Sequence, residues 1–286
     1  MGGKTYQDEA REIVDYNLFQ VPGSDEWFRG PEFSRESCEY ITFIGAAQTF
    51  GTFVRYPFPA ILSERLPRPT LNLGIGGAGP GRFLQDPALI DHANKGVFTV
   101  VQVMSGRSAE NSEFELLDGC SSMRRRGSKD RAVLAEVIWA QIIKERPQAD
   151  LKRLIRETQE DWVNKMRALL DRISTPKALV WISRRRPGAY PSDAAAALKE
   201  FPHFVTRKMV DQIKSRVDVF VDATSARGSP QALSSRFTGM PIGHVRSDTF
   251  VFQSGYPSPE MHEDIANALF PALHDMLPKL WRKFDV

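Results

Sequence analysis

Cysteine is nearly absent from this sequence, since Cys38 and Cys120 are the only two in 286 residues. They lie far apart in the chain and fit neither a disulfide framework nor the paired spacing of a metal site. We therefore predict two free thiols in a reducing compartment. The histidines also have no spacing that would let them share a metal, so we expect no metal and no cofactor.

Long hydrophobic runs are missing as well. No segment reaches the ~18 apolar residues that a membrane-spanning helix needs. Residues 1–20 are polar and charged, without the basic start and apolar stretch of a signal peptide. The sequence therefore predicts a soluble, cytoplasmic protein with no transmembrane segment.

The sequence also lacks an excess of charge of one sign. Its 38 basic and 35 acidic side chains leave a net charge of +3, a field too weak to indicate binding to nucleic acid. Any anion that the protein binds must therefore meet a local cluster of basic residues.

Hydrophobic residues are plentiful, at 42% of the chain, which is enough to bury a substantial core. We expect residues 1–40 to form a lead-in that packs on the domain, with a short helix over residues 8–16. Residues 41–286 are expected to form a single α/β domain with a helical insertion at about residues 119–173.

From residue 41 onward, apolar runs typical of buried strands alternate with helical patterns, which favours a parallel sheet covered on both faces. The expected strands are 41–44, 70–73, 97–104, 177–183 and 217–221, and the expected helices between and after them are 59–66, 88–93, 205–216 and 265–277. Residues 128–173 read as the longest helical stretch, divided near Arg146. Its second part carries an apolar stripe typical of a core-facing helix: Ile155, Trp162, Met166, Leu169 and Leu170.

Residues 41–51 read Ile-Thr-Phe-Ile-Gly-Ala-Ala-Gln-Thr-Phe-Gly. The apolar run ends at Gly45, as a buried strand does when it delivers a catalytic side chain at its carboxyl end. The stretch has the frame of a nucleophile turn. However, Ala46 and Ala47 stand where the motif Gly-Asp-Ser-x-Thr-x-Gly has Asp and Ser. This frame resembles the first sequence block of the SGNH/GDSL hydrolase superfamily.

Later segments resemble the further blocks of that superfamily, in its order. Residues 72–77 (Asn-Leu-Gly-Ile-Gly-Gly) are similar to the second block, and Gly77 falls where a backbone N–H donates to the oxyanion. Residues 100–108 are similar to the third block, with Arg107 at the position of the oxyanion asparagine and Ser108 at the position of the aspartate.

Residues 253–262 are similar to the last block, but Gln253 replaces its aspartate and Tyr256 its histidine. The resemblance thus implies an SGNH-like three-layer α/β fold with a central, mainly parallel sheet and a helical insertion. It also implies that all three members of the Ser/Asp/His triad are missing. The chain as a whole resembles a family of uncharacterised bacterial proteins, which supplies no mechanism to carry over.

Several side chains near these blocks are weak candidates for catalysis. Thr49 would need an adjacent base to act as a nucleophile, and we interpret it as the structural threonine of the motif. His262 could be a base shifted along the last loop. Ser258 and Pro259, however, read as the N-cap and first position of a helix, which places His262 about one turn inside it. The weak catalytic candidates are Gln48, Thr49, Tyr256 and His262.

Arg107 puts a positive, planar fork at the floor of the expected cleft, where it suits a carboxylate, sulfate or phosphate. The alternative is an ion pair with Glu110 or Glu113. Residues 184–186 (Arg-Arg-Arg) add charge at another strand end, whereas residues 124–127 are interpreted as a solvated loop. The expected ligand-binding residues are Gln48, Gly77, Arg107 and Tyr256.

Three functional hypotheses remain open. The first is a non-hydrolytic SGNH-like protein that binds an anionic carbohydrate, lipid headgroup or similar metabolite in the old active-site cleft. The second is a non-hydrolytic transferase in the biosynthesis of cell-envelope polysaccharide or lipid. The third is a structural or assembly subunit that forms a homo-oligomer through its helical insertion. A degenerate motif does not choose among them, because fold does not fix reaction.

Overall fold

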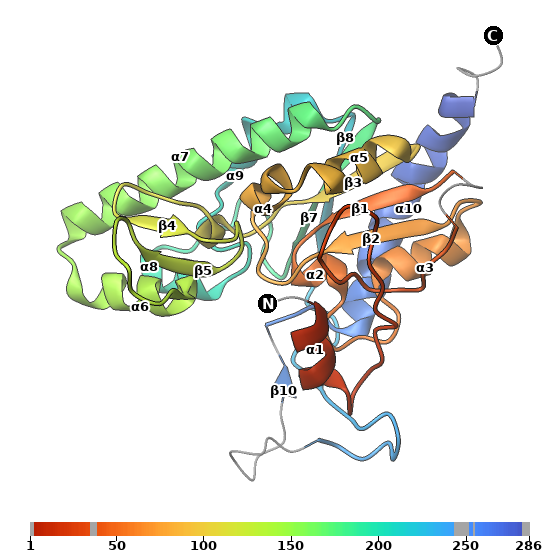
Figure 1. Cartoon of the computed structure of the whole chain (residues 1–286), viewed down its shortest axis with the longest axis horizontal. Coiled ribbons are helices and arrows are strands. Elements are labelled where there is room, and N and C mark those ends of the chain that lie inside the picture. Colours follow the sequence, from red (N-terminus) through yellow and green to blue (C-terminus); the bar gives the residue numbers. More distant parts are fainter. Residues whose placement is uncertain (1–2, 35–38, 243–251, 254, 282–286) are drawn as a thin grey trace.

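The computed structural model describes residues 3–34, 39–242, 252–253 and 255–281 (Figure 1). Over these residues, none of the helices combines the length and apolar character needed to cross a bilayer. Cys120 is buried with a free thiol, whereas Cys38 lies outside the described residues.

A five-stranded sheet forms the centre of the molecule, and all of its neighbouring strands pair in parallel. Its strands in spatial order are β2 (Thr70–Gly74), β1 (Ile41–Gly45), β3 (Phe98–Gln102), β7 (Lys177–Ser183) and β8 (Val219–Thr224). The strand order reverses between β1 and β3, as it does in doubly wound sheets, where ligands bind at the carboxyl ends beside that switch point. The expected three-layer α/β fold with a central parallel sheet is confirmed.

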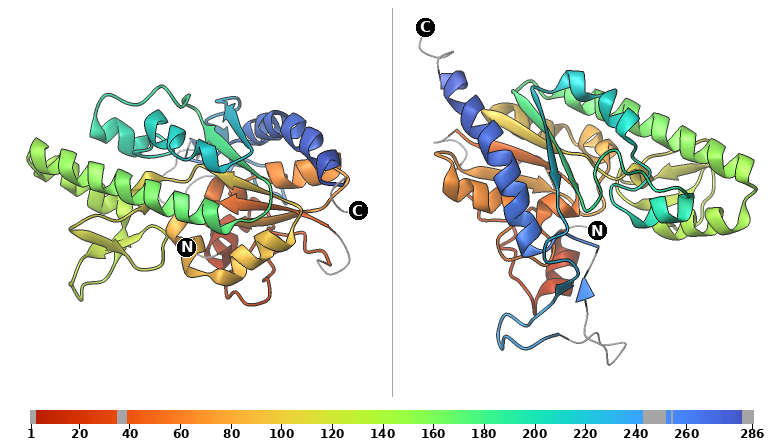
Figure 2. Two further views of the ribbon diagram at one scale, coloured as in Figure 1. Left: turned by 90° about the horizontal axis from the view of Figure 1, so that it is seen from above. Right: turned by 180° about the vertical axis from the view of Figure 1, so that it is seen from behind.

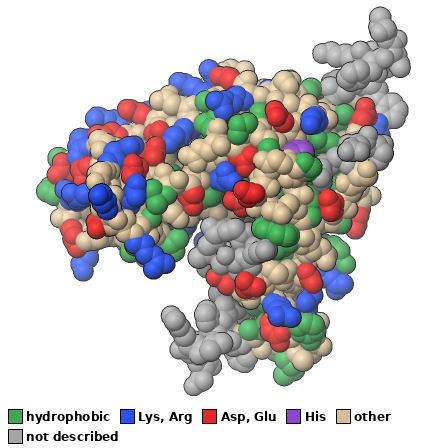
Figure 3. Space-filling model, viewed as in Figure 1, with side chains coloured by type: hydrophobic (Ala, Val, Ile, Leu, Met, Phe, Trp, Pro, Cys, Tyr) green, Lys and Arg blue, Asp and Glu red, His purple; other side chains and the backbone are tan. Residues whose placement is uncertain are grey.

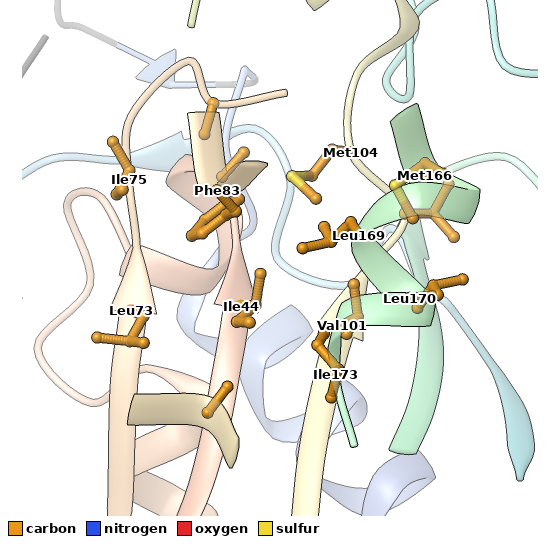
Figure 4. Close-up of a cluster of buried hydrophobic side chains, with 14 of the residues drawn as sticks. Ile44, Leu73, Ile75, Phe83, Val101, Met104, Met166, Leu169, Leu170 and Ile173 are labelled. Carbon is orange, nitrogen blue, oxygen red and sulfur yellow. The ribbon is translucent and has the colours of Figure 1, made fainter. Parts of the chain in front are cut away.

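Helices cover both faces of this sheet, as the two views in Figure 2 show. One face packs against α4 (Pro80–Gln85), α5 (Pro87–Lys95), α7 (Gln148–Arg172) and α9 (Arg207–Asp211), and the other against α3 (Phe58–Arg65) and α10 (Pro259–Trp281). On the first face Ile44, Leu73 and Val101 of the strands belong to the same core as Met166 and Leu169 of α7 (Figure 4). Alternate strand residues point to opposite faces, so each strand supplies both cores.

Strands lie just before and within the expected helical insertion at about residues 119–173. A three-stranded antiparallel sheet is formed by β4 (Phe114–Leu116), β5 (Ser122–Arg125) and β6 (Val133–Leu134), and it precedes α6 (Ala135–Glu145) and α7. The interpretation of residues 124–127 as a loop is therefore wrong at its start, because Arg124 lies in β5 and pairs with Glu115 of β4. An arginine-rich strand carries no alternating apolar pattern and gives no sequence signal. The break before α7 is confirmed.

Trp139 of α6 is fully buried and its ring meets Phe204 edge to face at 4.8 Å. These residues share a satellite core with Leu154 of α7 and with α8 (Ala194–Lys199), a helix that the sequence patterns did not indicate. This core stabilises the chain segment that runs from α8 to residue 205.

The N-terminal helix lies earlier than expected, at α1 (Gly3–Ala10), and residues 11–13 form a turn. The lead-in nevertheless packs closely, because Phe19 and Phe28 join the main core and Tyr16 packs with Phe50 of α2 (Ala47–Phe50). A short pair of strands, β9 (Gln231–Ala232) and β10 (Phe252–Gln253), completes the described elements together with two 3₁₀ turns. The domain boundary at residue 40 and the extent of the insertion stay predictions.

Charged side chains of both signs gather over the end of the molecule that holds β4, β5, α6 and the start of α7 (Figure 3). Glu113 pairs with Arg146 and Arg153 at 2.9 Å each, and Lys165 pairs with Glu110 at 2.9 Å. Each charge in this set meets an opposite charge. We call it the α7 ion-pair cluster: Glu110, Glu113, Arg146, Arg153, Glu157 and Lys165.

Candidate functional site

A cavity of about 710 Å³ lies at the carboxyl ends of the central strands. Its volume is in the range of small-molecule sites, roughly 300–1,000 Å³. The loops after β1, β2, β3 and β7 all contribute to its wall. This is where doubly wound sheets bind ligands, at the carboxyl ends of the strands beside the switch point. Residues 222–228, at the carboxyl end of β8, do not line it.

The turn after β1 is fixed by hydrogen bonds and brings small side chains to the cavity. Ala46 and Ala47 lie on the cavity wall. Thr49 is fully buried, and its hydroxyl donates to Gln102 Oε1 at 2.6 Å. The same oxygen accepts from Ala46 N at 2.9 Å, and Gln102 Nε2 donates to Gln48 Oε1 at 3.0 Å. Thr49 thus acts as a hydrogen-bond partner that fixes the turn, while Gln48 faces the cavity.

Gly77 lies at the rim of the cavity with a φ of +74°, a conformation that favours glycine. A Cβ atom at this position would overlap Ser121 Oγ. Ser108 Oγ donates to the Gly77 carbonyl at 3.0 Å, which ties the loop after β2 to the loop after β3. The Gly77 backbone is therefore held at the cavity wall by both neighbouring loops.

Arg107 lines the cavity, and among the described residues the acid that pairs with it is Glu136, in place of the alternatives Glu110 and Glu113. Its Nη1 donates to Glu136 Oε2 of α6 at 3.1 Å, and Glu136 is largely exposed. The same nitrogen lies 3.4 Å from His203 Nε2. The guanidinium is thus placed between an exposed acid at the rim and a buried imidazole deeper in the wall.

His203 also contacts Ser105, whose Oγ lies 2.8 Å from His203 Nδ1. Because Arg107 Nη1 can only donate, His203 Nε2 accepts from it and the imidazole proton stays on Nδ1, pointing at Ser105 Oγ. The backbone N–H of Arg107 donates to that oxygen too, at 3.3 Å. In this arrangement His203 donates to the serine and does not take its proton, so the pair is not an activated nucleophile.

Burial, followed by the positive charges of Arg107 and Arg185, holds the pKa of His203 well below its ordinary value. The imidazole is therefore neutral at pH 7. Two cations approach the same buried group from opposite loops, which makes this part of the cavity wall electropositive.

Tyr256 and His262 have separate positions. Tyr256 lines the cavity and its ring packs edge to face on Phe53 at 5.7 Å. His262 does not line it: the ring is fully buried, stacks on Phe58 and accepts from Phe58 N through Nδ1 at 3.1 Å. Ser258 Oγ caps α10 by accepting from Met261 N, as predicted. Burial lowers the pKa of His262 to about 3.

The structure thus brings Gln48, Gly77, Arg107 and Tyr256 to one cavity and leaves Thr49 and His262 behind its wall. Sequence reasoning missed four participants: Gln102, Ser105, Glu136 and His203. Gln102 carried a usable signal, because a glutamine in a buried apolar strand needs a partner. His203 carried none, since it is 98 residues from Ser105.

A resident metal has no obvious ligands here. Within the described ranges, histidine, cysteine and acidic side chains do not gather in threes as a metal ion would need. His244 lies outside those ranges. The donors that face the cavity are amide, hydroxyl and guanidinium groups, which suit an anionic or hydroxylated ligand.

In class, the protein is a doubly wound α/β protein with a cavity at the switch point of its sheet. The chain belongs to the family described as "Domain of unknown function (DUF6473)", whose model matches residues 4–117 and 141–277. The unmatched residues 118–140 contribute Ser121, Leu134 and Glu136 to the cavity wall.

Among solved structures, the chain is similar to a lipase from a goat rumen metagenome, with 12% identity, a TM-score of 0.45, and coverage of 82% of this chain and 97% of that one. It is similar to TesA, with 10% identity, a TM-score of 0.42, and coverage of 82% and 98%. It is also similar to a catalytic mutant of an acetylxylan esterase from Geobacillus stearothermophilus, with 14% identity, a TM-score of 0.41, and coverage of 82% and 93%. A comparison with curated proteins finds no match.

Proposed function

We propose that this chain is an SGNH-like protein without the Ser/Asp/His triad, and that it binds a small anionic ligand in the switch-point cavity. The ligand class is an anionic carbohydrate, a lipid headgroup or a similar metabolite. The observation that carries the proposal is Arg107, a cation on the cavity wall. On the same wall Ala47 stands where the resemblance places the serine nucleophile, and Ala46 where it places the aspartate before it. A guanidinium binds planar or tetrahedral oxyanions through paired N–H groups.

The neighbouring groups support this use of the cavity. Gln48 accepts through Oε1 from Gln102, so its amide nitrogen is the donor that it can offer to a ligand. The Gly77 backbone and the Tyr256 hydroxyl supply further polar groups on the wall. A ligand held by Arg107, Gln48 and Gly77 would lie over the turn that carries a nucleophile in a hydrolase.

A crystal soaked with phosphate, sulfate or a sugar carboxylate tests the site directly. We expect ligand density beside Gly77 and Arg107. Density only over β4–β6 and α6 would contradict the proposal and favour an interface role for the insertion. The observation that supports an interface role is the exposure of Leu117, Val133 and Val137 in this region. Light scattering of the purified protein would reveal the resulting homo-oligomer.

A non-hydrolytic transferase acting in cell-envelope polysaccharide or lipid biosynthesis is the second candidate. Gln48, Arg107 and Tyr256 on the cavity wall favour it, because a transferase can operate through positioning and charge stabilisation without a serine nucleophile. Since His203 donates to Ser105, we expect no turnover of nitrophenyl acetate above background, and no change with Thr49→Ala. Saturable hydrolysis that is abolished by Ser105→Ala and retained by Thr49→Ala would replace the binding proposal with an enzymatic one.

A further inference from the structure

Arg185 is a buried cation at the carboxyl end of β7, on the same cavity wall. Only 8% of the residue is exposed. Among the described residues, Arg185 forms no ion pair, in contrast to the α7 ion-pair cluster, where each charge has a partner. A buried charge without a counter-charge is costly, so proteins keep such groups paired or use them to bind ligands.

The guanidinium is held in place by only one of its nitrogens. Arg185 Nη2 donates to the carbonyls of Pro202 and Val205, at 2.8 Å each. Arg185 Nε and Nη1 are buried and have no hydrogen-bond partner. Buried donors of this kind are rare in folded proteins, because each leaves an uncompensated loss of hydration. The carbonyls and the Trp181 ring, 4.8 Å from Cζ, orient the fork without neutralising it.

The charge of Arg185 converges with that of Arg107 on His203, whose pKa is lowered first by burial and then by both cations. The two acids on the cavity wall, Glu136 and Glu200, are both exposed. The region around His203 therefore combines two positive charges with two buried N–H groups of Arg185 that have no acceptor. An oxyanion would supply both the missing charge and the missing acceptor.

We propose that Arg185 anchors an oxyanion subsite on the β7 side of the cavity, which takes a carboxylate or phosphate group of the ligand. This inference rests on the proposed function and deepens it, because it gives the ligand a second anchor across the cavity from the β1 turn. The unpartnered donors are shielded from water. Tyr190 is 37% exposed and its ring lies 5.7 Å from Cζ, so the proposal requires this side chain to shift when the anion enters.

Calorimetric titration with inorganic phosphate and with acetate, at ionic strength matched with chloride, tests the subsite. The variants are Arg185→Gln, Arg185→Lys and the control Arg186→Gln, which removes an exposed arginine outside the cavity lining. We expect Arg185→Gln to weaken binding at least about tenfold, as loss of a charged hydrogen bond does. The affinity of Arg185→Lys should lie between those of the wild type and Arg185→Gln, and the affinity of the control should equal that of the wild type. Stronger binding of phosphate than acetate would identify a phosphorylated ligand, and the reverse a carboxylate.

Unchanged binding by a folded Arg185→Gln variant would overturn the inference. If Arg107→Gln still weakens binding in that case, the proposed function stands without this subsite. If the wild type binds neither anion, both fail. If Arg185→Gln does not fold, an NMR titration of the wild-type protein tests the subsite through the ¹⁵N–H signal of Arg185 Nε. It shifts on addition of the anion if the subsite exists, and a constant signal would overturn the inference.

Discussion

The α7 ion-pair cluster and the cavity wall handle charge in opposite ways. In the cluster, Glu113 meets Arg146 and Arg153, and all of these side chains keep contact with solvent. In the cavity wall, Arg185 is buried without an acid, and His203 is kept neutral between two cations. Pairing satisfies a charge within the fold, whereas an unpaired buried charge leaves binding energy for a ligand. This contrast is the reason that we propose the ligand site in the cavity wall and not in the α7 ion-pair cluster.

A pH titration should separate the two regions most strongly. His203 and His262 have lowered pKa values, so they stay neutral when folded and take up protons when unfolded. Their contribution to stability is fully present above pH 6.5 and is lost as the pH falls below it. For His262 the loss continues to about pH 3. In this window we expect each histidine to lower the free energy of unfolding by up to about 1.4 kcal/mol for every unit by which the pH falls.

The α7 ion-pair cluster should lose its contribution to stability at a lower pH than the histidines begin to. The pKa values of Glu110 and Glu157 are both lowered. Burial alone would raise the pKa of Glu110, but its hydrogen bonds and the charge of Lys165 outweigh burial. For Glu157 the largest cause is its hydrogen bond with Ser112. Their contribution is present above about pH 4.5 and is lost as the pH falls further. Urea unfolding between pH 7.5 and 3.5 measures the loss of stability. Between pH 6.5 and about 4.5 it reports the histidines, and below that the loss from the cluster adds to that from His262. His203→Gln should reduce the loss from the histidines and not that from the cluster, and a flat free energy of unfolding between pH 7 and 5 would contradict the comparison.

Removing one charge from each region gives the second test. Arg107→Gln should weaken the binding of sulfate, phosphate or a carboxylate by about 1.5–3 kcal/mol, the range for a hydrogen bond to a charged group. Arg153→Gln, in the α7 ion-pair cluster, should leave that affinity unchanged because its partners are Glu113 and Glu157. Calorimetry on both variants decides, and equal losses would mean that binding follows overall charge and no particular site.

Backbone packing around the cavity gives a third test. A Cβ atom at Gly74 would overlap the Phe50 backbone nitrogen of α2, which cannot move without shifting the β1 turn. Gly74→Ala should therefore lower the free energy of unfolding by about 1–3 kcal/mol. Gly188→Ala is the matched control, because its Cβ would meet no atom within 4 Å. Similar denaturation midpoints for both variants would show that the cavity wall is looser than the structure indicates.

The smallest effect is expected from the rim. Glu136→Gln removes the exposed acid that pairs with Arg107 and so leaves the guanidinium more available to a ligand anion. Because such exposed pairs contribute about 0.2–1 kcal/mol, anion affinity should rise by no more than that amount. Calorimetry under the conditions used for Arg107→Gln measures it. A loss of affinity would place Glu136 among the ligand's own contacts.

The sequence determined the elements of the central sheet, because each is encoded locally. Apolar runs ending at Gly45 and Gly74 gave the strands, and the stripe through Trp162 and Met166 gave the core face of α7. The convergence of the loops after β1, β2 and β3 followed from parallel pairing alone, since parallel strands end at the same edge of a sheet. The arginine-rich β5 was missed because its polar residues have no period.

Only the tertiary structure decided how the side chains of the cavity are paired. Ser105 meets His203 across 98 residues, and Arg107 meets Glu136 across 29. The burial of Arg185 between β7 and the chain near Pro202 set it apart from its exposed neighbours Arg184 and Arg186. Such contacts depend on how crossover connections bring distant loops together. A local pattern indicates whether a residue is buried in its own strand or helix, but it does not predict which distant side chain will contact that residue.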